Sequence, residues 1–111
     1  MPIFITQGRY THQAIKGLVS KPEDRGEEVR QLFERAGCRL LSFYITFGEY
    51  DFLIICEAPN PNAIISAVAV AGAGGGVTDV KTTLAITTAE AKDAFAAASK
   101  AASKFRSAGQ S

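Results

Sequence analysis

The feature that most restricts the fold is a pair of apolar segments separated by a short polar turn. Along residues 38–47, successive side chains fall on two opposite faces and one face is apolar, which is typical of a half-buried β-strand. Residues 52–56 are almost uniformly apolar, as expected for a strand covered on both faces. Gly48-Glu49 lies in the short gap, so the two segments are predicted to form an antiparallel hairpin. On the first strand the two sets are Leu41, Phe43, Ile45 and Phe47 against Leu40, Ser42, Tyr44 and Thr46.

Two more strands are predicted, one on either side of this hairpin. Residues 3–9 divide into two alternating sets, Ile3, Ile5 and Gln7 against Phe4, Thr6 and Gly8, and several are β-branched, which favours a first strand. Residues 77–87 show the same pattern and are predicted as a fourth strand. The glycine-rich stretch 72–76 before it lacks the Lys-Ser/Thr pair of a phosphate-binding loop and precedes a strand, so it is interpreted as a connector.

Helices are predicted between the first strand and the hairpin. Thr11 offers a cap for a short helix over residues 12–18. The stretch Ser20-Lys21-Pro22-Glu23 predicts the start of a second helix, because Ser20 can cap it and Glu23 completes a capping box. Gly37 is expected to end that helix as a C-terminal cap.

The remaining helices follow the hairpin and the fourth strand. Asn60 is predicted to cap a small-residue helix over residues 63–71, with Pro61 at its first position. An alanine-rich helix is predicted from Thr87 or Thr88 toward Arg106, docked on the domain by two phenylalanines of one stripe. That stripe comprises Ala91, Phe95, Ala98, Ala102 and Phe105. We therefore expect a domain over residues 1–90, then this helix and a tail fraying at 109–111 within residues 91–111.

The order strand, helix, strand, strand, helix, strand predicts an α+β fold. It corresponds to a ferredoxin-like βαββαβ arrangement, in which a four-stranded antiparallel sheet carries both helices on one face. The opposite face then exposes Tyr44 and alternate members of the 52–56 strand, and apolar patches of that kind usually mark an interface. We expect a homodimer, or a higher even oligomer, built through this sheet face.

Several short segments resemble the GYD-domain family, which is named for a Gly, a Tyr and an Asp. The chain carries these as Gly48, Tyr50 and Asp51, and roughly residues 1–90 share the resemblance. Further matching segments are Gly8-Arg9-Tyr10-Thr11, Lys21-Pro22-Glu23-Asp24-Arg25 and Ala36-Gly37-Cys38-Arg39-Leu40. The resemblance implies the dimeric α/β barrel superfamily and no established activity. Gln13-Ala14 departs from the acidic residue and glycine expected there.

Charge and cysteine content narrow the possible partners and surroundings. Twelve basic and eleven acidic residues give a net charge of +1, so no overall field attracts nucleic acid or a membrane surface. No signal peptide or membrane-spanning run is recognised, which favours a cytoplasmic protein with reduced cysteines. The predicted hairpin register leaves Cys38 and Cys56 about 13 Å apart along the strand, too far for a disulfide. No metal or other cofactor is expected.

Five residues are predicted to bind a ligand, while no catalytic residue is identified: Tyr10, His12, Tyr44, Tyr50 and Asp51. The Tyr50 hydroxyl beside the Asp51 carboxylate is suited to orienting a polar group or moving a proton. Turn chemistry offers a structural alternative, with Gly48 at a positive φ and Asp51 bonding local amides. His12 is interpreted either as a base near the mouth of a cleft or as an exposed residue in the first turn of a helix.

Four functions are compatible with this pattern. The first is a ligand-binding or regulatory module with a pocket between sheet and helices, suited to a small apolar or aromatic ligand. Four of the predicted ligand-binding residues would lie at the entrance of this pocket: Tyr10, His12, Tyr44 and Tyr50. The second is a cofactor-independent monooxygenase or isomerase, by analogy with related barrels. The third is a structural or stress-related dimer. RNA binding ranks last, because Glu49 and Asp51 would repel phosphate.

Overall fold

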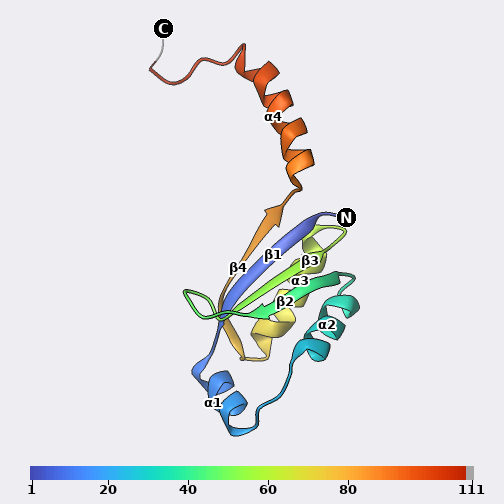
Figure 1. Cartoon of the computed structure of the whole chain (residues 1–111), viewed down its shortest axis with the longest axis vertical. Coiled ribbons are helices and arrows are strands. Elements are labelled where there is room, and N and C mark those ends of the chain that lie inside the picture. Colours follow the sequence, from blue (N-terminus) through green and yellow to red (C-terminus); the bar gives the residue numbers. More distant parts are fainter. Residues whose placement is uncertain (110–111) are drawn as a thin grey trace.

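Four antiparallel strands form one sheet in the order β2-β3-β1-β4 in the computed structural model, which describes residues 1–109 (Figure 1). Its elements are β1 (Ile3–Tyr10), α1 (His12–Ser20), α2 (Gly26–Arg35), β2 (Arg39–Ile45), β3 (Phe52–Glu57), α3 (Pro61–Ala73), β4 (Val77–Ala85) and α4 (Thr88–Ala102). The predicted α+β fold with a four-stranded antiparallel sheet is confirmed.

The core lies between α2, α3 and one face of the sheet. On β3 the buried residues Phe52, Ile54 and Cys56 alternate with half-buried neighbours. Phe33 of α2 and Ile64 of α3 join the same cluster, so both helices cover the same face. The prediction that this strand is covered on both faces is therefore wrong for the single chain.

Three predicted helix ends are confirmed by their hydrogen bonds. The Thr11 hydroxyl accepts from the Ala14 N–H at 3.2 Å, and the Asn60 side chain accepts from the Ala63 N–H at 3.0 Å. Gly37 adopts a φ of +87° directly after the second helix, a conformation that glycine takes without steric cost.

The start of α2 and the pattern of β2 differ from their predictions. Residues 21–25 are irregular and α2 begins at Gly26, whose N–H donates to the Asp24 side chain at 2.8 Å. Ser20 is the last residue of α1 and does not cap α2, so the predicted start of this helix is wrong. A bulge at Leu41 lets Leu40 oppose Cys56 while Ser42 opposes Ile55. Strict alternation is therefore broken, and Leu40 points to the covered face together with Phe43.

The hairpin connection is longer than the predicted turn and spans residues 46–51. Phe47 lies outside the strand and is fully exposed. Gly48 does not adopt a positive φ, so the turn role predicted for it is wrong. The observed register also corrects the predicted separation of the cysteines, because Leu40 opposes Cys56 and Cys38 is only two residues from that position. Both are buried free thiols.

α4 extends away from the sheet at the end where β4 finishes (Figure 1). It has no buried residue, and Phe95 and Phe105 are 73% and 74% exposed, so the predicted docking is wrong for the single chain. The helix ends at Ala102 instead of near Arg106. The predicted fraying at 110–111 lies outside the described residues. Across residues 1–109, every helix is too short or too polar to cross a membrane.

Candidate functional site

The 46–51 connection is held against the end of β1 by backbone and side-chain hydrogen bonds. The Thr46 N–H donates to the Asp51 carbonyl at 2.9 Å, and its hydroxyl donates to the Tyr50 carbonyl at 2.7 Å. Arg9 Nε donates to the Glu49 carbonyl at 2.8 Å. The connection is thus fixed from both sides, although it is a surface loop.

Asp51 bonds to β1 through both its backbone and its side chain. Its N–H donates to the Gly8 carbonyl at 2.8 Å, and its Oδ2 accepts from the Tyr10 N–H at 2.9 Å. The amide that the carboxylate binds lies on another strand, not in the local turn as predicted. Asp51 therefore positions the backbone of Tyr10.

The Tyr10 ring packs on Phe52, with the ring centroids 5.4 Å apart and the planes tilted by 46°. This arrangement depends on Gly8, since a Cβ there would lie 2.6 Å from Phe52 Cζ and 3.1 Å from Val80 Cγ2. A glycine, an aspartate and an aromatic neighbour thus place Tyr10 at the mouth of the covered face.

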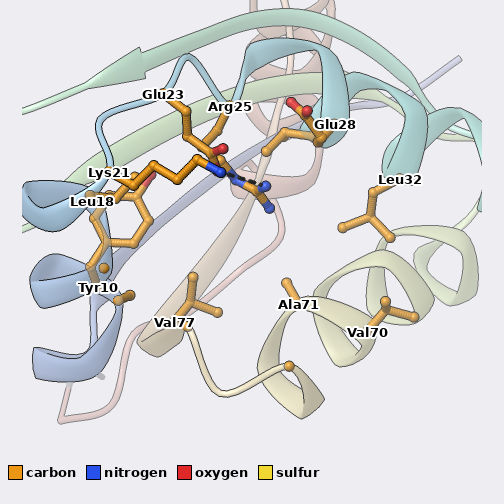
Figure 2. Close-up of a pocket in the computed structure, with 15 residues that line it drawn as sticks. Tyr10, Leu18, Lys21, Glu23, Arg25, Glu28, Leu32, Val70, Ala71 and Val77 are labelled. Atoms are coloured by element: carbon orange, nitrogen blue, oxygen red, sulfur yellow. Dashed lines mark hydrogen bonds and ion pairs between the residues drawn. The ribbon is translucent and has the colours of Figure 1, made fainter.

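Two clefts meet at Tyr10. The first, which we call the α1–α3 cleft, has a volume of about 630 Å³ and lies between α1, α2 and α3 (Figure 2). Lys21, Glu23 and Arg25 gather on one side of it and face Val77 and Ala71 on the other (Figure 2). An apolar wall opposite a charged rim suits a ligand with an apolar body and a polar end.

The second cleft, which we call the β2 cleft, has a volume of about 680 Å³ and lies between α1, the 21–26 loop and β2. Its apolar walls include Ile15, Phe43 and Phe47, and Asp51 lies at its edge. The two clefts share Tyr10, Leu18, Glu23 and Arg25. The 21–26 loop therefore separates two parts of one hollow region.

The charged groups around Tyr10 largely compensate one another. Arg25 donates to the Glu23 carboxylate at 3.1 Å, and Arg30 pairs with Glu27 and Glu34 on α2. Burial raises the pKa of Tyr10 above its ordinary value; the Arg25 charge opposes this rise and the Asp51 charge adds to it. The Tyr10 hydroxyl consequently remains protonated at neutral pH and serves as a neutral hydrogen-bonding group.

Of the five residues predicted to bind a ligand, the structure brings Tyr10 and Asp51 together at the clefts. His12 is exposed at the first position of α1, and Tyr50 is half-buried in the 46–51 connection. Tyr44 opposes Leu53 on the bare sheet face, away from both clefts.

Sequence reasoning missed the cleft-lining residues of the 21–26 loop and the neighbouring helix, above all Glu23 and Leu18, and interpreted Arg25 as a surface residue. The sequence signal for this loop is a proline among charged residues of both signs, Lys21-Pro22-Glu23-Asp24-Arg25, which also fits a capping box. A capping box would place Glu23 in the first turn of α2, whereas the structure places Glu23 in the loop before α2, at the cleft.

The bare sheet face is a second surface of interest. Ile5 of β1 opposes Ile55 of β3, and Leu53 opposes Tyr44 of β2, which is 63% exposed. Along their strands these residues alternate with the buried core residues, and no helix packs on this face. They form a continuous apolar stripe across three strands, here called the sheet-face patch.

Among residues 1–109, no group of three or more His, Cys, Asp or Glu side chains is placed to hold an ion.

Comparison with known proteins gives a consistent picture. The GYD domain model matches residues 4–95. The "Glutamine synthetase and cystathionine beta-lyase binding protein" of Thermus thermophilus is 36% identical over 69 residues, which are 61% of this chain and 72% of that protein. The crystal structure of TTHA0845, also from Thermus thermophilus, is similar with a TM-score of 0.51 and 15% identity, covering 78% of this chain and 95% of that one. The structural likeness concerns the fold alone.

Proposed function

This chain belongs to the GYD-domain family, and on that premise we propose that it is a binding or regulatory module that works as a homodimer. The ligand is a small apolar or aromatic molecule with a polar end, held around Tyr10 between the sheet and its helices. The observation that carries this proposal is the meeting of the two clefts at Tyr10, beneath a loop in which Arg25 is paired with Glu23.

The chemistry around Tyr10 supports binding over catalysis. A general acid or base works best with a pKa near the operating pH. Burial moves the pKa of Tyr10 away from neutrality, and the Asp51 carboxylate is occupied by the Tyr10 amide. Both groups are therefore better suited to holding a ligand and the backbone in place than to transferring a proton.

The homodimer is proposed through the sheet-face patch, giving the dimeric α/β barrel that the fold allows. Face-to-face packing would bury Ile5, Leu53, Ile55 and Tyr44, which the single chain leaves half-buried or exposed. Burial of apolar surface stabilises by about 25 cal/mol per Å², so covering such a patch favours pairing. The buried free thiols fit a cytoplasmic location, which is part of the proposal.

A protein partner is the second candidate, favoured by a specific observation. The Thermus thermophilus relative is described as binding two enzymes, glutamine synthetase and cystathionine beta-lyase. In this chain Phe47 is fully exposed, and Ile45 is 53% exposed beside the β2 cleft. An exposed aromatic side chain next to a hollow is the kind of anchor that protein interfaces use.

Ligand binding is tested by titration with 8-anilinonaphthalene-1-sulfonate, an aromatic anion whose fluorescence rises in apolar surroundings. Saturable binding is expected, and Leu18→Asp should weaken it about tenfold or more, because Leu18 lines both clefts and the new charge enters their apolar wall. Val19→Asp is the matched control, since the adjacent Val19 is 75% exposed. Equal effects of the two substitutions would contradict the proposed site.

A further inference from the structure

α4 is an apolar arm that its own domain leaves uncovered. It has no buried residue, and Phe95 stands 73% exposed on the stripe that also carries Ala91 and Ala98. The chain has a radius of gyration of 18.3 Å, whereas a compact domain of this length has about 13 Å. Isolated helices of about this length are marginal in water, so a helix of this kind gains stability from a packing partner.

An uncovered apolar groove lies on the covered side of the same domain. It has a volume of about 450 Å³ and lies between α3 and β4, so we call it the α3–β4 groove. Ile64 and Val68 form its floor with Phe4, while Ile65 and Leu84 line it at 61% exposure each. The groove is large enough for an aromatic side chain and almost entirely apolar.

The groove opens at the end of the sheet from which α4 departs. Leu84 is the second-last residue of β4 and opposes Phe4, and α3 begins with Pro61 at the same end. The arm therefore begins next to the groove in sequence, but α4 extends away from α3 and the sheet (Figure 1) and buries no residue within one chain.

The connection between β4 and α4 explains why they do not meet. Only Ile86 and Thr87 separate the two elements. Thr87 and Glu90 form a reciprocal capping box, at 3.1 Å and 3.2 Å, which fixes where the helix begins. A fold-back onto the chain's own groove would have to break that box or reverse the chain within Ile86 and Thr87.

We propose that α4 of one copy docks in the α3–β4 groove of a second copy, with Phe95 as the aromatic anchor, and that the exchange is reciprocal. Each copy then supplies one arm and one groove, so a two-fold pair makes every contact twice. The surface involved lies on the covered side of the sheet. The inference therefore goes beyond the proposed function, because it uses neither the sheet-face patch nor the Tyr10 clefts.

Cross-linking of the full chain tests this contact. One preparation carries Ala98→Cys on the arm and another carries Ala69→Cys in the groove, and the mixture is treated with a short bifunctional maleimide. The native Cys38 and Cys56 are buried and react slowly. The expected product is a covalent pair joining residue 98 of one copy to residue 69 of the other, identified by mass spectrometry. Links between two arms alone would overturn the proposal.

A single chain carrying both substitutions separates exchange from fold-back. Closure within one chain, at a rate independent of dilution, would overturn the proposal, as would the absence of any link. Phe95→Ala should lower the yield of the intermolecular link about tenfold, the usual scale for an aromatic anchor. Lys100→Cys, on the opposite face of α4, replaces Ala98→Cys as the control and is expected to link poorly.

The sheet-face dimer is kept apart from this test by one additional substitution. Leu53→Glu places a charge in the sheet-face patch while leaving arm and groove intact. The two cysteine variants carrying Leu53→Glu are expected to cross-link as before. Failure of the sheet-face dimer and failure of the arm exchange therefore give different results.

Discussion

The backbone N–H of Tyr10 donates a hydrogen bond of 2.9 Å to Oδ2 of Asp51, joining the last residue of β1 to the residue just before β3. The Asp51 N–H completes the contact by donating to the Gly8 carbonyl at 2.8 Å. The regular pairing between β1 and β3 ends at Gly8 opposite Phe52, two residues before β1 itself ends. Asp51 therefore extends the contact between these strands beyond the ladder and holds the backbone that carries Tyr10.

Replacing Asp51 is expected to destabilise the fold before it alters any ligand contact. Asp51→Ala leaves the partly buried Tyr10 N–H without its acceptor and should lower the free energy of unfolding by about 1–3 kcal/mol. Asp51→Asn keeps an acceptor oxygen and should cost less. Urea denaturation measures both. Glu49→Ala is the control, because Arg9 bonds only the backbone carbonyl of Glu49, and an equally large loss there would contradict this role.

Gly8 is expected to be intolerant of even one added methyl group. A Cβ would approach the Phe52 ring to 2.6 Å, and Phe52 is 5% exposed and packed on Tyr10, so the ring cannot move aside freely. Gly8→Ala should cost about 1–3 kcal/mol by overpacking. Gly48→Ala meets open space and should change stability by less than about 0.5 kcal/mol.

Thermal denaturation of the two variants decides this prediction. Phe52→Leu in the Gly8→Ala background should recover part of the loss, because it removes the ring that the methyl group meets. Similar melting temperatures for Gly8→Ala and Gly48→Ala would show that the close approach of a Cβ to Phe52 does not destabilise the fold.

The caps of α3 and α4 should behave differently, because within one chain only α3 packs on the domain. Asn60→Ala removes a cap from a helix that buries Ile64 and Ala67, so it should lower the free energy of unfolding by about 1 kcal/mol. Thr87→Ala removes the capping box of α4 and should reduce helical ellipticity at low protein concentration, with little change in the denaturation midpoint. A large shift of that midpoint for Thr87→Ala would mean that α4 unfolds together with the domain.

Alkaline pH is expected to destabilise the protein through its buried thiols. Burial, with a contribution from Cys38, raises the pKa of Cys56 from 9.0 to about 11. On raising the pH, the Cys56 thiol loses its proton in the unfolded chain before it does so in the folded chain. The contribution of this group to the free energy of unfolding is therefore complete below pH 9 and is lost as pH rises through about 11. A shift of this size corresponds to about 2–3 kcal/mol.

Urea denaturation at a series of pH values between 8 and 11 checks this expectation. Cys56→Ala should flatten the decline in unfolding free energy over that range. Part of the decline should persist, because burial also raises the pKa values of Cys38 and Tyr10. An unchanged slope in the Cys56→Ala variant would exclude Cys56 as its source.

Much of the fold followed from local patterns, because those patterns act over a few residues. Thr11 and Asn60 cap their helices as predicted, since a cap needs only a side-chain oxygen and an amide three residues later. The bulge at Leu41 could not be predicted, because it depends on the partner strand and one extra residue moves Leu40 to the other face. The cysteine register failed partly for the same reason and partly because the hairpin pairs Ile45 with Phe52.

The site was harder to predict than the fold. Tyr10 and Asp51 were predicted to bind a ligand from their types and positions, but the hydrogen bond between them could not be predicted, because it joins residues 41 apart in the sequence. Tyr44 was assigned to the ligand pocket although the strand register places it on the opposite face. The stripe on α4 predicted docking on the domain, and this prediction is wrong for the single chain, because periodicity alone does not tell whether the same chain offers a surface for the stripe.

Native mass spectrometry of the freshly purified protein tests the central claim most directly, because it reports assembly and any retained small molecule together. We expect an even assembly, at twice the 11.8 kDa of one chain or a multiple of that, carrying additional mass from a bound ligand. Leu18→Asp should remove the additional mass and leave the assembly intact. A bare monomer at micromolar concentration would contradict both the sheet-face dimer and the binding module.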